Sequence, residues 1–257
     1  MDPGLRGVLM AISLFFGMVG MAEVGRRVAT YRARGDPERV RSGMGVVEGA
    51  AFGLLGLILA FTFSGAANRF DLRRQQIVQE ANAIGTAWLR LDILAPDDQP
   101  QLRETFRSYV DARLTASREV DAHYGQALAA MQRASDLQGE IWRRSRAACE
   151  RDARTCLLLL SSINEMLDIA TSRTMAARTH APSIVFGLLF AVALLSATLA
   201  GYAMAGGTSG PWLHTISFAL LTALTTYVIY DLEYPRTGLI RLDAADQALV
   251  ELRASMH

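Results

Sequence analysis

The sequence predicts an all-α membrane protein with four transmembrane helices and a soluble helical bundle inserted between the second and third spans. Uncharged stretches close to the ~20 residues that cross a bilayer occur in two pairs. The residues between the pairs combine many charges with hydrophobic residues at helical spacing, and no strand-like alternation is present. We therefore divide the chain into spans 1 and 2 (1–67), a soluble helical domain (68–180), spans 3 and 4 (181–230) and a C-terminal tail (231–257).

Composition narrows the class of function. The 257 residues are 51% hydrophobic with a net charge of +1, which argues against a nucleic-acid-binding protein. No phosphate-binding loop and no Gly-x-Ser-x-Gly, HExxH or CxxC motif occurs, and the four histidines are scattered. We expect no catalysis and no bound metal or cofactor.

The first span is predicted at 5–24 and the second at 45–67. Small residues form a stripe on one face of the second span. Such stripes let another helix approach closely, because short side chains leave the backbones room. The residues expected to pack in this way are Gly49, Gly53, Gly56 and Ala60.

The opposite face of the second span is bulky. We predict that it lines a pore between protomers, as an apolar neck that ions cross only when it is wetted. The predicted lining residues are Glu48, Phe52, Leu55, Leu59 and Thr62. Two alternatives stay open: the bulky side chains face lipid or the other spans, and Glu48 is an ordinary solvated carboxylate at the membrane surface.

The second span is predicted to continue as one helix into water, because no Gly or Pro lies between Gly65 and Gly85. Amphipathic helices at 101–120, 124–148 and 157–178 complete the bundle. Between the last two, Cys149 and Cys156 are either a disulfide in an oxidising compartment or a pair of reduced thiols.

The third span is predicted at 182–204 and the fourth at 212–230. Thr222, Thr226 and Tyr230 share a polar face, whose hydroxyls either bond within the helix bundle or line a water-filled path. Directly after this span, Asp231 and Glu233 are a candidate cation site or a solvated pair. Two carboxylates are few for Ca²⁺, which takes about 6–8 oxygen ligands.

Four spans place both termini and the helical domain on one side of the membrane. Six arginines lie in residues 26–41, on the other side. Eight lie near span ends on the domain side: Arg6, Arg69, Arg73, Arg74, Arg173, Arg178, Arg236 and Arg241. On this count we expect the termini and the domain in the cytoplasm. All 26 basic residues are Arg in a chain rich in Ala and Gly, which indicates a GC-rich bacterial genome, so the membrane is expected to be a bacterial inner membrane.

Two segments carry a family resemblance. AFGLLGLILAFTFSGAANRFDLRRQQIVQEANAIGTAWLRLD (51–92) and YDLEYPRTGLIRLD (230–243) are similar to the signatures of the bestrophin-like family of bacterial membrane proteins, which is distantly similar to bestrophin channels. The order of two spans, a helical insert and two spans resembles that family too. The resemblance implies a pentamer, although the acidic cluster that binds Ca²⁺ in bestrophins is reduced here to Asp231 and Glu233.

We therefore predict a homo-oligomeric ion channel in membrane lipid, with a pore lined by the second span. It passes small ions of undetermined selectivity, and the resemblance favours a pentamer. The alternative is a membrane-anchored scaffold or sensor whose helical domain binds a partner.

Overall fold

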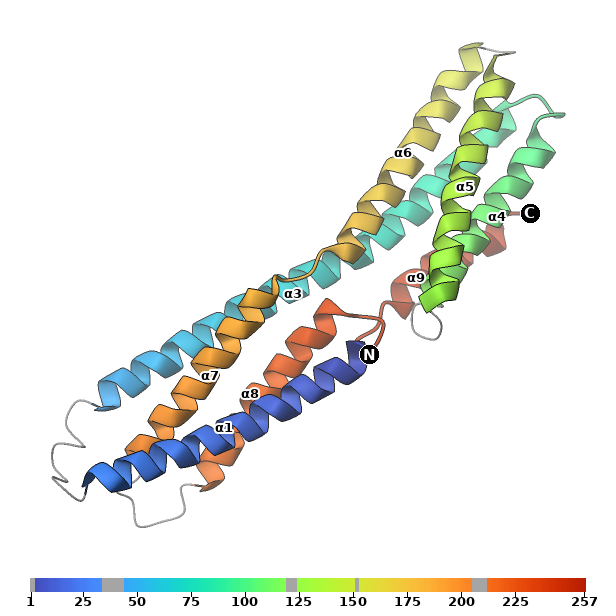
Figure 1. Cartoon of the computed structure of the whole chain (residues 1–257). Coiled ribbons are helices and arrows are strands. Elements are labelled where there is room, and N and C mark those ends of the chain that lie inside the picture. Colours follow the sequence, from blue (N-terminus) through green and yellow to red (C-terminus); the bar gives the residue numbers. More distant parts are fainter. Residues whose placement is uncertain (1–2, 34–43, 119–123, 151–152, 205–211) are drawn as a thin grey trace. The chain divides into compact units, whose positions relative to one another are not determined.

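The computed structural model describes residues 3–33, 44–118, 124–150, 153–204 and 212–257 (Figure 1). Within these ranges every regular element is a helix, which confirms the predicted fold class. The elements are α1 (Pro3–Ala33), α3 (Met44–Leu89), the 3₁₀ turn η1 (Arg90–Ile93), α4 (Gln99–Arg118), α5 (Tyr124–Cys149), α6 (Ala153–Arg178), α7 (Ser183–Ala203), α8 (Trp212–Glu233) and α9 (Asp243–Ser255).

The chain divides into two compact units. We call Met1–Arg69 with His180–Leu239 the span unit, and Phe70–Thr179 with Ile240–His257 the helical unit. The predicted C-terminal tail is thus shared between them: its first residues belong to the span unit, whereas α9 belongs to the helical unit.

Among the described residues, four helical stretches are long and apolar enough to cross a membrane: Gly4–Arg32, Gly45–Ile93, Cys156–Ala203 and Trp212–Glu233. They overlap all four predicted spans, and their membrane-spanning parts belong to the span unit. They pack around one apolar core. Its buried members come from α1 (Leu14, Met18, Ala22), α3 (Leu55), α7 (Leu189, Ala193, Ala197) and α8 (Ala219). In Figure 1, α1 crosses both α7 and α8, with which it is in contact.

The helices α1 and α7 approach each other closely at two glycines. A Cβ atom added to Gly25 would lie 2.0 Å from the carbonyl oxygen of Thr198, and one added to Gly201 would lie 1.8 Å from that of Ala22. Since no real Cβ tolerates such distances, both positions require glycine. The small-residue packing expected of the second span therefore operates, within the chain, between the first and third spans.

The second span and the helix after it form one unbroken helix, α3, as predicted. The sequence explains this, because the only glycine between Ala66 and Trp88 is Gly85 and there is no proline. A short 3₁₀ turn, η1, then ends the helix before the turn that precedes α4.

The helical unit packs the second half of α3 with α4, α5, α6 and α9 around a larger core. Phe106 and Tyr109 of α4, Ile141 of α5 and Ile163 of α6 are fully buried there. From α9, Leu249 joins the same core. Cys149 and Cys156 are joined by a disulfide between the end of α5 and the first turns of α6.

Candidate functional site

The bulky face of α3 packs inside the span unit. Leu55 is only 2% exposed, and Leu59 packs on the same core. The rings of Phe52 and Phe218 meet edge to face at 4.9 Å, and Thr62 is buried and donates a hydrogen bond of 2.6 Å to the Ile58 carbonyl. These side chains are used in packing within one chain, so a path between protomers would need a different face of α3.

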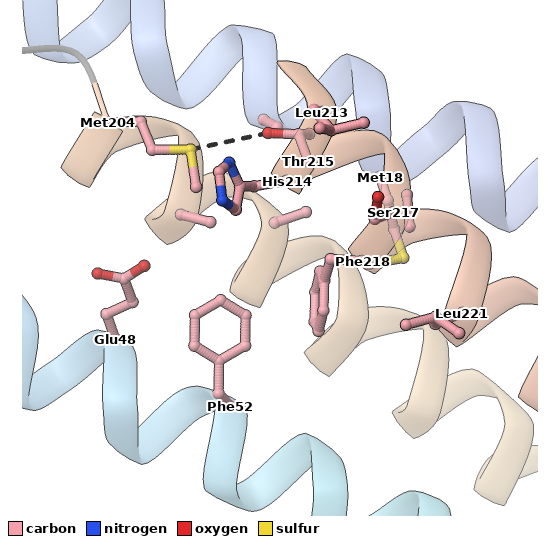
Figure 2. Close-up of a pocket in the computed structure, with 14 residues that line it drawn as sticks. Met18, Glu48, Phe52, Met204, Leu213, His214, Thr215, Ser217, Phe218 and Leu221 are labelled. Atoms are coloured by element: carbon pink, nitrogen blue, oxygen red, sulfur yellow. Dashed lines mark hydrogen bonds between the residues drawn. The ribbon is translucent and has the colours of Figure 1, made fainter. Parts of the chain in front are cut away.

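Glu48 belongs to the same inward face. It borders a cavity of about 470 Å³ within the span unit, lined by all four spans. Figure 2 shows Glu48 and Phe52 pointing from α3 toward this cavity, with His214 and Phe218 of α8 across from them. The carboxylate is thus turned toward the other spans of its own chain, rather than toward the outward face of α3. The cavity has mostly apolar walls, and its polar side chains are those of Glu48, His214, Thr215 and Ser217.

The small-residue stripe lies on the outward side of α3. Gly49, Gly53, Gly56 and Ala60 are all exposed, and a Cβ built at any of the three glycines meets no other heavy atom within 4 Å. Beside the stripe, Leu57 and Phe61 are exposed as well, Phe61 by 70%. This outward apolar face of α3, defined by these six residues, is available in the single chain to lipid or to another helix.

The polar face of the fourth span is buried. Thr222 and Thr226 lie inside the span unit, and Thr226 donates a hydrogen bond of 2.8 Å to the carbonyl of Thr222. This is the back-bonding that satisfies hydroxyls within a membrane helix. Tyr230 packs against Phe186, Tyr234 and the backbone at Gly7. In the single chain, these three residues are packing groups.

Asp231 and Glu233 face different partners. The Leu239 N–H donates a hydrogen bond of 3.0 Å to Asp231, whose carboxylate fills the space where a Gly238 side chain would be. Glu233 is fully buried and accepts a hydrogen bond of 2.8 Å from Nε of Arg69 and one of 3.3 Å from the Ala181 N–H. The hydrogen bonds of the two carboxylates thus go to different parts of the span unit. Among the described residues, no three His, Cys, Asp or Glu side chains form a metal-binding group.

Arg69, His180, Glu233 and Tyr234 form what we call the α8-end cluster. The imidazole of His180 lies 3.7 Å from Glu233 and stacks on Tyr234 at 4.5 Å. The cluster brings together the two signature segments of the sequence, one through Arg69 and the other through Glu233. The pairing escaped sequence analysis because 164 residues separate the partners. The sequence offered one signal for this pairing: each signature segment carries a charged residue next to an apolar span.

A second buried ionic cluster lies in the helical unit. Glu80 is fully buried, and it accepts hydrogen bonds from Tyr109 Oη at 3.1 Å and from Arg113 at 2.9 Å. It also pairs with Arg173, which reaches Asp246 of α9 at 3.6 Å. Burial alone would raise the pKa of Glu80, but Arg113 and Arg173 outweigh that effect and hold the pKa below its usual value. The cluster connects four helices with balanced charge.

Known proteins agree with this architecture. A point mutant of a bacterial Bestrophin homologue from Klebsiella pneumoniae is similar in structure, with a TM-score of 0.69 and 15% identity over 95% of this chain and 98% of that one. A second structure of a Klebsiella pneumoniae Bestrophin homologue gives a TM-score of 0.65 and 13% identity, over 93% and 98% of the two chains. At such identities the likeness shows the fold. No curated protein matches the chain.

The sequence itself carries the family assignment. The profile of the Bestrophin-like domain matches residues 8–246, which include the last three spans, all but the first residues of the first span, and nearly all of the helical unit. The match also includes both signature segments and the residues of the α8-end cluster. The chain therefore belongs to the Bestrophin-like family.

Proposed function

We propose that the protein is a homo-oligomeric ion channel, a ring in which α3 of each protomer lines a central path for small ions. The observation that carries this proposal is the outward apolar face of α3. Leu55 and Thr62 of that span are buried against the protomer's own helices, whereas this face is exposed and a Cβ built at its glycines meets no other heavy atom within 4 Å. Family membership supports a channel-type function in general, and the resemblance to bestrophins favours five protomers.

The two halves of the outward face suit two tasks. The small residues would let a neighbouring protomer's helix approach, because short side chains allow two helix backbones to lie close together. These residues are Gly49, Gly53, Gly56 and Ala60. Leu57 and Phe61 lie beside that stripe and would project toward the axis. There they would form an apolar constriction that conducts only when wetted. This assignment replaces Phe52, Leu55, Leu59 and Thr62, which pack within the protomer.

A second candidate function is a membrane-anchored scaffold or sensor. Large apolar side chains are exposed on the helical unit, among them Leu128, Leu157 and Leu158. Such residues can contact a partner protein. Under either function we place the protein in a bacterial inner membrane, and we propose no catalytic activity.

Single-channel recording in planar bilayers tests the channel. We expect discrete currents from the purified oligomer, and a larger unitary conductance for Phe61→Ala and Leu57→Ala, because truncation widens the constriction and favours its wetting. Phe52→Ala is the matched control, since its ring packs on Phe218 inside the protomer, and its unitary conductance should not change. A well-assembled oligomer that carries no current would favour the scaffold. Larger currents in Phe52→Ala alone would return the lining to the inward face.

A further inference from the structure

We infer from the disulfide between Cys149 and Cys156 that the helical unit lies on the oxidising side of the membrane. This places the domain opposite to the cytoplasmic side expected from the count of arginines at all span ends. Two independent observations carry the inference: the geometry of the cysteine pair, and the arginines of the short connection between α1 and α3.

The cysteine pair is built into the packing of the helical unit. Cys149 is the last residue of α5 and Cys156 lies in the first turns of α6, with the Cα atoms 5.3 Å apart, inside the range that a disulfide requires. The two residues are only 7% and 5% exposed, so the bond is shielded once formed. They are the only cysteines of the chain, and alternative pairing within one protomer is excluded. The bond closes the connection between two packed helices.

Such a bond persists where thiols are kept oxidised. Disulfides are rare in the cytosol, where reducing systems maintain free thiols. Formation here removes two electrons and two protons from the Cys149 and Cys156 thiols. The electrons and protons pass, through a mixed disulfide, to a thiol–disulfide oxidoreductase. The disulfide of that enzyme is thereby reduced to a dithiol. This class of oxidant acts on the oxidising side of the membrane, so the helical unit has to be there when it folds.

The distribution of arginines agrees with this orientation when the long insert between the second and third spans is left out of the count. The positive-inside rule applies to short connections, because long domains cross the membrane largely regardless of their charge. Without the insert Phe70–Thr179 and its flanking Arg69, the domain side retains four arginines: Arg6, Arg236, Arg241 and Arg253. On the opposite side, six lie within residues 26–41. This dense group marks the α1–α3 connection as the cytoplasmic one, which leaves the helical unit outside.

Thiol trapping in intact cells tests the disulfide. Cells expressing the full chain are treated with N-ethylmaleimide at lysis, and the protein is then incubated with a polyethylene-glycol maleimide before or after reduction. We expect no adduct before reduction and two adducts after it. In cells that lack the periplasmic thiol oxidase, both thiols should be blocked at lysis. Two free thiols in wild-type cells would overturn the disulfide.

Fusions to the end of the chain test the side of the membrane without any substitution. Alkaline phosphatase fused after His257 should be active, because it folds only where its own disulfides form, and green fluorescent protein fused there should be dark. As a second measurement, Ser135 and Ser42 are replaced singly by cysteine in a Cys149→Ser/Cys156→Ser background. Ser135 is exposed on α5, and Ser42 lies in the α1–α3 connection. An impermeant maleimide should label only Ser135→Cys; label at Ser42→Cys alone, or a fluorescent fusion, would contradict the inference.

Discussion

At the residue scale, two fully buried carboxylates form ion pairs with arginines of other helices. Glu233 joins α8 to Arg69 of α3 and to the backbone before α7, and Glu80 joins α3 to Arg113 and Arg173. Removing one partner from a buried ion pair leaves the other charge without compensation, which costs about 3–5 kcal/mol. Both carboxylates are therefore expected to matter far more for stability than the many exposed pairs.

We predict that Arg69→Ala destabilises the span unit by about 3–5 kcal/mol, because the buried Glu233 carboxylate loses its arginine partner. Arg74→Ala is the matched control: that arginine is 57% exposed and lies 3.7 Å from an equally exposed Asp71, so its loss should cost about 0–1 kcal/mol. Thermal unfolding in mild detergent, followed by circular dichroism, compares the two. Equal midpoints would show that the Arg69–Glu233 pair adds nothing.

The lowered pKa of Glu80 predicts that the stability of the helical unit depends on pH. Since its pKa is lowered in the folded chain, ionised Glu80 stabilises the helical unit fully above its unfolded pKa of about 4.3. That contribution is lost as the pH falls through the lower folded value. Glu80→Gln should remove it and reduce stability at neutral pH, whereas Glu104→Gln, whose side chain is 71% exposed, should change little. Urea unfolding between neutral pH and pH 3 gives both comparisons, and an unchanged pH profile in Glu80→Gln would contradict the role of this cluster.

At the element scale, glycine decides how α1 and α7 pack. We predict that Gly25→Ala and Gly201→Ala destabilise the span unit, because the added methyl group would overlap a carbonyl of the facing helix. Gly20 lies on α1, as Gly25 does, but a Cβ atom there meets nothing within 4 Å. Gly20→Ala should therefore be neutral or slightly stabilising, since alanine favours helix more than glycine does. Melting temperatures of the three variants provide the measurement. Tolerance of Gly201→Ala would mean that the helices separate easily.

The elements could be predicted from the sequence because their signals are local. Charge-free length marks the spans, and the absence of Gly and Pro predicts the unbroken α3. The rotation of α3 about its axis could not be predicted, because small and bulky faces both pack well against helices. The partner of Glu233 and the glycine contact between α1 and α7 depend on residues far apart in the chain, which no spacing rule brings together.

At the scale of the whole molecule, the outward apolar face of α3 is exposed in the single chain. We predict that Gly53→Leu weakens assembly, because the larger side chain holds neighbouring backbones apart. Gly187→Leu on α7 is a control, since a Cβ there also meets nothing within 4 Å. Size-exclusion chromatography with light scattering in mild detergent separates oligomer from monomer. Native size in Gly53→Leu would indicate that this stripe contacts lipid instead.

The most direct test of the channel is the symmetry of the assembled particle. Cryo-electron microscopy of the protein in lipid nanodiscs should reveal a closed ring, with five protomers favoured, in which α3 lies nearest the axis and Leu57 and Phe61 narrow a continuous path. A monomer, or a dimer in which the outward apolar face of α3 contacts lipid and no axial path exists, would contradict the account.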